Sequence, residues 1–296
     1  MVSKGQERIL SRRANYRLMA IVRKLGANIG AEITDVNVKN LDGKTFEKIY
    51  QAWLNYGVTV VRAQDLTTED FIAYGRRFGE IVPHPSKSTR HFKHPEITCL
   101  GINKFKLDGT LNEDIYKRGA IEFHTDGAYD EVPFKATKLY ALAVPNVGGE
   151  THFSCMYMAY DALPKKLKTL LQDRRGGFTY GGRKGQNALL NPEDRDHAPV
   201  FHPLIRPHSE TGRKALYFDP GKIVQIEGLE AAESDDIIDE LTERMIVSGA
   251  EYTHTWQVGD IVIWDNRCLV HKAAGNYPPQ EDRIHWRLSI KESVSD

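Results

Sequence analysis

The chain opens with a helical pattern followed by a strand pattern. Apolar residues recur at helical spacing over 45–56, and Gly57 is placed to end that helix. The apolar positions are Phe46, Ile49, Tyr50, Trp53 and Leu54. The β-branched run 58–61 predicts a strand. Capping residues at 67–70 then predict a second helix that ends near Phe78-Gly79. We therefore expect the opening of the chain to mix helix and strand.

Beyond Leu139 the pattern changes to short strands separated by Pro, Gly and Asn turns. The predicted strands cover 139–144, 150–153, 215–218, 251–256, 260–264 and 284–290. Two predicted helices, 157–171 and 234–247, interrupt them. Strands at this density predict a mainly β fold of the sandwich type, with helices at its flanks.

No internal repeat or low-complexity linker divides the 296 residues, so a single domain spanning 1–296 is predicted. Residues 1–20 are expected to form a flexible N-terminal arm. The Gly-, Arg- and Asn-rich stretch 176–197 has weak periodicity and predicts a long loop over the surface or the mouth of a site.

Composition narrows the classes of function. Forty Lys and Arg residues balance forty Asp and Glu residues, which argues against a protein built to coat nucleic acid or an anionic membrane. Three scattered cysteines without a Cys-x-x-Cys pair favour neither a disulfide framework nor a thiolate zinc site, and they are typical of a reducing compartment. No apolar run approaches the roughly 18 residues that span a bilayer. We expect a cytoplasmic protein.

A metal site is suggested by two separate segments. His124 and Asp126 form a His-x-Asp triplet, and in an extended segment residues i and i+2 project from the same face. His271 lies just past a buried-looking strand near the other end of the chain. Two histidines and one carboxylate on one face are typical of mononuclear non-haem Fe(II) oxygenases. Each residue alone is also compatible with an ordinary hydrogen-bonded or core position.

Two arginines strengthen this interpretation. Arg283 and Arg287 lie four residues apart on a predicted strand, so their side chains are expected to share a face and one cavity. A 2-oxo acid that chelates iron has a distal carboxylate, which a guanidinium can bind with two hydrogen bonds. A surface salt bridge is the alternative for either arginine.

With these residues assembled, the chain resembles the taurine dioxygenase family of Fe(II)/2-oxoglutarate-dependent oxygenases from about Gly26 to Ile290. The motifs that carry the resemblance occur in the family's order. They are Gly26–Ile33, Arg77–Glu80, His84-Pro85, Phe123–Asp126, Pro145 with Gly148–Thr151, Trp256 with Gly259-Asp260, Trp264–Arg267, His271 and Arg283.

The resemblance implies a double-stranded β-helix, or jelly roll, with a site at its mouth. Iron would be bound by the residues that match His124, Asp126 and His271. Thr151 matches the family's hydroxyl donor to 2-oxoglutarate, and Arg283 matches the arginine that pairs with the distal carboxylate.

The substrate residues carried over are Arg287, which matches an arginine for the substrate's anionic group, and His84, which matches a pocket histidine. The chain departs from taurine dioxygenase at Lys87, where a pocket tyrosine is expected, and at Ala120 and Phe123. Lys87 would add positive charge near Arg287, and the alternative is a Lys87 that points to the surface. We therefore expect a small, carboxylate-bearing substrate rather than taurine.

The expected reaction uses Fe(II), 2-oxoglutarate and O₂ to hydroxylate a C–H bond, with release of succinate and CO₂. Desaturation, cyclisation and oxidative cleavage share the same ligands and stay open, as does a non-redox metal-binding jelly roll or hydrolase. The Thr151 and Arg283 pair favours the oxygenase. A neutral chain without a basic stripe argues against nucleic acid as a partner. By analogy with relatives, we expect a homo-oligomer, a dimer or tetramer.

Overall fold

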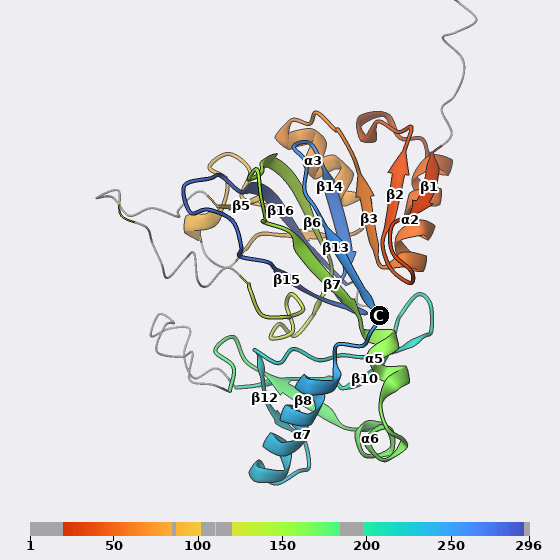
Figure 1. The fold of residues 1–296 in the computed structure, drawn as a ribbon, viewed down its shortest axis with the longest axis vertical. Helices are drawn as coiled ribbons and strands as arrows, with labels where there is room; N and C mark the ends of the chain where they lie inside the picture. Colours follow the sequence, from red (N-terminus) through yellow and green to blue (C-terminus); the bar gives the residue numbers. More distant parts are fainter. Residues whose placement is uncertain (1–19, 85–86, 102–109, 111–119, 184–197, 293–296) are drawn as a thin grey trace, which may run out of the picture.

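The computed structural model describes residues 20–84, 87–101, 110, 120–183 and 198–292. Within these residues the protein is mainly β, with helices at its edges (Figure 1). One eight-stranded sheet forms the frame, in the order β1-β2-β3-β14-β6-β16-β4, with β5 also on β16. Its strands are β1 (Ile21–Lys24), β2 (Ala31–Thr34), β3 (Val58–Val61), β4 (Ile81–Val82), β5 (Thr98–Leu100), β6 (Phe134–Ala143), β14 (Ile261–Asp265) and β16 (Ile284–Lys291).

The two faces of this main sheet carry two different hydrophobic cores. Along β14, Ile261 and Ile263 pack into one core, while Val262 and Trp264 pack into the other, as the two-residue period of a strand requires. Helices α2 (Gly43–Tyr56) and α3 (Thr68–Arg76) cover the first face. A three-stranded sheet, β13 (Glu251–His254), β7 (Thr151–Cys155) and β15 (Leu269–Ala273), contributes to the second core.

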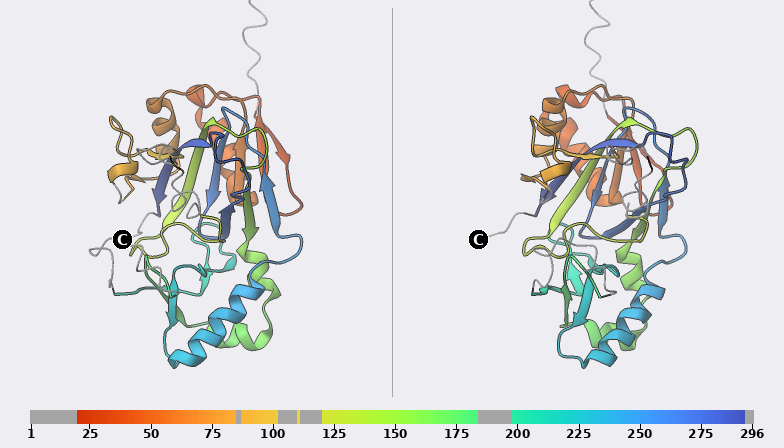
Figure 2. Two further views of the ribbon diagram at one scale, coloured as in Figure 1. Left: turned by 60° about the vertical axis from the view of Figure 1, so that its left-hand side comes forward. Right: turned by 90° about the vertical axis from the view of Figure 1, so that its left-hand side faces the viewer.

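Helices and short strands form a further layer at the end of these sheets, in the lower half of Figures 1 and 2. The helices are α5 (Met156–Ala162), α6 (Lys165–Leu171) and α7 (Ala231–Arg244). The strands are β8 (Arg175–Phe178), β9 (Val200–Pro203), β10 (Ile205–Pro207), β11 (Lys214–Leu216) and β12 (Ile223–Ile226). Two 3₁₀ turns, Val38–Asn40 and Lys87–Thr89, complete the described elements. Among the described residues, no helix is both long and apolar enough to cross a membrane.

The two helices predicted near the start of the chain are confirmed. Asp42 caps α2, and Gly57 ends it with a φ of +69°. A capping box between Thr67 and Asp70 begins α3.

Two predictions further along the chain differ from the structure. The helix expected over 157–171 is broken into α5 and α6 at Leu163-Pro164, because a proline has no N–H for the helix interior and its ring clashes with the preceding turn. The first residues of the loop expected over 176–197 belong instead to strand β8. Glycine allows close packing there, because a Cβ on Gly176 would lie 2.9 Å from the Leu204 side chain. Residues 184–197, and residues 1–19 of the expected arm, lie outside the described residues.

One lysine is fully buried on the face of the main sheet that α3 covers. Lys138 Nζ lies 3.5 Å from the ring centroid of Tyr74 and 4.1 Å from that of Phe78, and it donates to the Tyr74 carbonyl at 3.1 Å. Within the described part of the chain, no carboxylate forms an ion pair with it. Burial lowers the pKa of Lys138 well below its ordinary value.

We predict that Lys138→Met reduces the pH dependence of stability. Between the lowered pKa and the unfolded value of about 10.4, the unfolded chain holds a proton that the folded chain lacks. The free energy of unfolding of the parent protein should therefore rise with pH relative to the variant, by up to about 1.4 kcal/mol per pH unit. Urea unfolding at pH 7, 8 and 9 measures this difference. The exposed Lys165→Met is the control, and parallel curves for parent and Lys138→Met would show that Lys138 stays charged.

Candidate active site

The predicted metal ligands meet through a backbone pairing between distant segments. The His124 N–H donates to the His271 carbonyl at 3.0 Å, and the His271 N–H donates to the His124 carbonyl at 2.8 Å. This isolated antiparallel bridge sets the two residues directly opposite each other, so their side chains share a face. Their ring centroids lie 4.2 Å apart.

Asp126 completes the group. Its Oδ1 lies 3.8 Å from His124 Nε2, and its Oδ2 lies 3.6 Å from His271 Nε2. Gly127, with a φ of +74°, turns the chain directly afterwards, where a Cβ would lie 2.7 Å from the Phe134 ring. One potential ligand atom from each of the three residues lies within 4.8 Å of the others. This spacing suits donors around a common ion.

The hydrogen bonding of His124 and the pKa shifts of His271 and Asp126 fit a divalent metal. His124 Nδ1 lies 2.9 Å from the Glu122 carbonyl, which can only accept, so Nε2 of the neutral ring keeps its lone pair. Burial lowers the pKa of His271 well below its ordinary value, which keeps that imidazole neutral. Burial alone would raise the pKa of Asp126, but the Arg287 guanidinium opposes it, and the pKa lies below its ordinary value. Two imidazole nitrogens and one carboxylate are a donor set that Fe(II) accepts.

Arg287, on β16, contacts this group directly. Its Nη2 forms a 2.9 Å ion pair with Asp126 Oδ1, a contact that the sequence did not suggest. Its Nε is buried and has no hydrogen-bond partner among the described residues. A guanidinium carries five N–H donors, so Arg287 keeps others besides the buried Nε and the one that contacts Asp126.

Arg283 and Thr151 form a second polar pair. Arg283 Nε donates to the Gly149 carbonyl at 2.7 Å, and its Nη2 donates to Thr151 Oγ1 at 3.1 Å. Trp256 Nε1 donates to the same oxygen at 3.0 Å. Because these two bonds occupy both lone pairs of the Thr151 hydroxyl, only its proton is left for a ligand. The pair thus presents donors alone, which suits a carboxylate.

A cavity of about 300 Å³ joins the two groups, a size typical of small-molecule sites. Arg283 and Arg287 both line it, as the strand pattern predicted, although a register shift between Ile284 and His285 interrupts the regular alternation. The lining residues are Leu100, Gly101, Ala120, His124, Asp126, Leu139, Thr151, Trp264, His271, Ala273, Gly275, Tyr277, Arg283 and Arg287.

The other two predicted substrate residues lie elsewhere. Neither His84 nor Lys87 is among the described residues that line the cavity. His84 Nδ1 lies 3.3 Å from the Thr89 hydroxyl, and its carbonyl accepts from Arg90 Nε at 2.6 Å. Lys87 is exposed on the 3₁₀ turn Lys87–Thr89.

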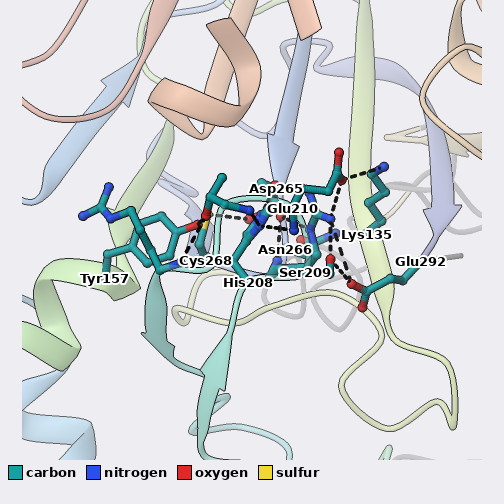
Figure 3. A network of polar contacts seen from close by, with 12 residues as sticks. Lys135, Tyr157, His208, Ser209, Glu210, Asp265, Asn266, Cys268 and Glu292 are labelled. Atoms are coloured by element: carbon teal, nitrogen blue, oxygen red, sulfur yellow. Dashed lines mark hydrogen bonds and ion pairs between the residues drawn. The ribbon is translucent and has the colours of Figure 1, made fainter. Parts of the chain in front are cut away.

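A buried polar network lies beside the end of β14 (Figure 3). Arg267 binds both oxygens of Asp265, at 2.9 and 2.7 Å, and Asp265 also pairs with His208 at 3.0 Å. Arg267 extends the network to Glu210, which binds Lys135. His208, Asp265 and Cys268 lie close enough to form a second metal group, but the Arg267 guanidinium already neutralises that carboxylate. We interpret the network as structural.

Four residues near the site had no predicted role there. Trp256 and Trp264 belong to motifs of the resemblance and are buried; Trp256 donates to Thr151, and Trp264 lines the cavity. Asn266 lies in the Trp264–Arg267 motif, which could have pointed to it. Tyr277 lines the cavity but belongs to no motif of the resemblance.

Comparison with known proteins agrees with this geometry. The family model described as "Taurine catabolism dioxygenase TauD, TfdA family" matches residues 21–289. A (S)-phenoxypropionate/alpha-ketoglutarate-dioxygenase of Sphingobium herbicidovorans is 34% identical over 91% of this chain and 94% of its own length. An alpha-ketoglutarate-dependent 2,4-dichlorophenoxyacetate dioxygenase of Cupriavidus pinatubonensis is 30% identical over 86% of this chain and 92% of its own.

Solved structures give the same result for the fold. A taurine dioxygenase from Burkholderia xenovorans superposes with a TM-score of 0.76 at 26% identity, covering 93% of this chain and 90% of its own. AAD-2 in complex with Mn(II) and N-oxalylglycine superposes with a TM-score of 0.79 at 23% identity, covering 94% and 99%, which speaks for the fold alone. Because the family model spans nearly the whole chain and curated relatives match it at 30% identity or more, the protein belongs to the TauD, TfdA family and is an α-ketoglutarate-dependent dioxygenase.

Proposed function

We propose that the protein hydroxylates a C–H bond of a small carboxylate-bearing molecule. The reaction consumes one 2-oxoglutarate (α-ketoglutarate) and one O₂, and it yields succinate, CO₂ and the hydroxylated product. The observation that carries the proposal is that one cavity joins a two-histidine, one-carboxylate group to the donor pair Thr151 and Arg283. A hydrolase has no evident use for that second pair.

His124, Asp126 and His271 would hold the ferrous ion, which supplies the activation of O₂ when it is bound. Arg283 and Thr151 would bind the distal carboxylate of 2-oxoglutarate, because both present donors and a carboxylate only accepts. Within the described residues no ion pair occupies Arg283, so its charge is available. These residues orient the co-substrate and leave the reaction itself to the metal.

Arg287 would bind the carboxylate of the primary substrate, because it lines the cavity and its guanidinium has more N–H donors than its contact with Asp126 uses. The relatives are named for phenoxypropionate and 2,4-dichlorophenoxyacetate, each a carboxylate joined to an apolar aromatic group. The apolar side chains of Leu100, Leu139 and Trp264 in the cavity support a substrate with an apolar body. His84 and Lys87 stay predictions for this role.

We also infer that the main sheet and the sheet β13-β7-β15 are the two faces of a double-stranded β-helix, within one domain spanning 1–296. The shared core between them supports this interpretation.

The proposal is tested by succinate formation from 2-oxoglutarate with Fe(II) and ascorbate, across a panel of carboxylates, sulfonates and amino acids. A carboxylate with an apolar body should stimulate succinate formation and be recovered with one added oxygen. Stimulation by sulfonates alone would contradict the carboxylate assignment.

We predict that Arg283→Gln weakens 2-oxoglutarate binding without changing metal content. Loss of a charge-assisted pair in a dry site costs about 2–5 kcal/mol, which corresponds to roughly tens to thousands of fold in affinity. Anaerobic titration of the Fe(II) protein, followed by the visible charge-transfer band that 2-oxoglutarate produces, measures the affinity. Arg175→Gln, an exposed arginine paired with Glu227, is the matched control. Unchanged affinity in Arg283→Gln would assign the distal carboxylate to another residue.

We predict a different defect for Arg287→Ala. The variant should bind 2-oxoglutarate and retain basal succinate formation, yet lose the stimulation by substrate. Metal affinity is measured in parallel, because Arg287 also contacts Asp126. Arg287→Lys keeps the charge without the planar pair of donors and should be intermediate. If Arg287→Ala is stimulated as the parent is, the substrate carboxylate is bound elsewhere.

A further inference from the structure

A chain of hydrogen bonds runs from the core to the candidate metal ligand Asp126. Trp264 Nε1 donates to Asn266 Oδ1 at 3.0 Å, and Asn266 Nδ2 donates to Thr137 Oγ1 at 3.0 Å. The Thr137 hydroxyl donates to Asp126 Oδ2 at 2.6 Å. Trp264 and Thr137 are direct partners in the pairing of β14 with β6.

The direction of every bond in this chain is determined by its first member. An indole N–H can only donate, so the Asn266 atom facing it must be the carbonyl oxygen. The same oxygen also faces the backbone N–H of Asp126 at 3.5 Å. A flipped amide would bring its NH₂ group against both donors, so Asn266 must direct Nδ2 at Thr137.

The Thr137 hydroxyl must therefore donate its proton to Asp126. One lone pair of its oxygen accepts from Asn266, and its proton points to Asp126 Oδ2. The 2.6 Å length is that of a hydroxyl bound to a charged carboxylate. Thr137, Asn266 and Trp264 are each at most 2% exposed, so water does not compete for these bonds.

The backbone around Asn266 is held as well. Its carbonyl accepts from the Thr125 hydroxyl at 2.8 Å, and its chain neighbours Asp265 and Arg267 belong to the buried network of Figure 3. The chain of hydrogen bonds thus starts from a rigid support.

We propose that Thr137 is a positioning residue for the metal: by holding Oδ2, while Arg287 contacts Oδ1, it fixes the rotation of the Asp126 carboxylate toward the two histidines before the ion binds. The inference rests on the proposed role of Asp126 as a ligand. A carboxylate fixed in advance loses no rotational freedom on binding, so the benefit appears in metal affinity. The methyl group of Thr137 has no part in this role.

The test compares Thr137→Val with Thr137→Ser. Valine keeps the shape and removes the donor, whereas serine keeps the donor. We measure the dissociation constant for Mn(II) by electron paramagnetic resonance of the free ion, without turnover. Thr137→Val should bind about 10- to 100-fold more weakly. Thr137→Ser should stay within about threefold of the parent, since its hydroxyl can make the same bond. If Thr137→Val folds poorly, Thr137→Ala replaces it, and the same weakening of Mn(II) binding is expected.

Thr59→Val is the matched control. Thr59 is another fully buried strand threonine, on β3, and its hydroxyl has no hydrogen-bond partner among the described residues. It should leave the Mn(II) constant unchanged. Equal weakening in Thr59→Val and Thr137→Val would mean that a general packing effect explains the loss, and it would overturn the proposal.

Asp126→Ala separates failure of the inference from failure of the proposed site. If Asp126→Ala abolishes Mn(II) binding while Thr137→Val binds as the parent does, Asp126 is a ligand and Thr137 does not position it. If Asp126→Ala also binds normally, the metal site itself is wrong and the inference falls with it.

Discussion

The site depends on one antiparallel pairing, the two reciprocal backbone hydrogen bonds between His124 and His271. Backbone bonds leave little freedom in relative position, so the two imidazoles share a face without further support. Asp126 follows within the same segment, and Asn266, 140 residues away from it, lies against its backbone N–H. The sheets and their two cores hold these distant segments in register.

Buried polar groups around the cavity are arranged by what each can accept or donate. Trp256 and Trp264 are donors only, and each directs the hydrogen bonding of a smaller polar residue. As a result Thr151 turns its proton toward the cavity, and Thr137 turns its proton toward Asp126. A dry environment strengthens such bonds and makes a wrongly directed one costly.

The sequence predicted the strands that frame the site, because β14 is a short apolar run rich in β-branched residues and β16 alternates between apolar and polar residues. It predicted the ligand candidates His124 and Asp126 because His-x-Asp is a local motif. Local pattern could not reveal β8, since Gly176 and Gly177 have low strand propensity and are needed there for close packing. The contact of Arg287 with Asp126 also escaped prediction, because the sequence does not show which of several charges a buried arginine will meet. In the sequence Thr137 looks like any other strand residue, because its contact with Asn266 forms only in the folded protein.

The separation of the candidate ligands along the chain has a consequence for biosynthesis. A ribosome adds about 5–20 residues per second, so on the order of ten seconds pass between the synthesis of Asp126 and that of His271. During this interval the candidate site has only one of its imidazoles and its carboxylate, too few donors to retain a ferrous ion against the competing ligands of the cell. Loading of the metal would therefore follow release and folding of the chain, and the finished fold rather than the nascent peptide would select the ion.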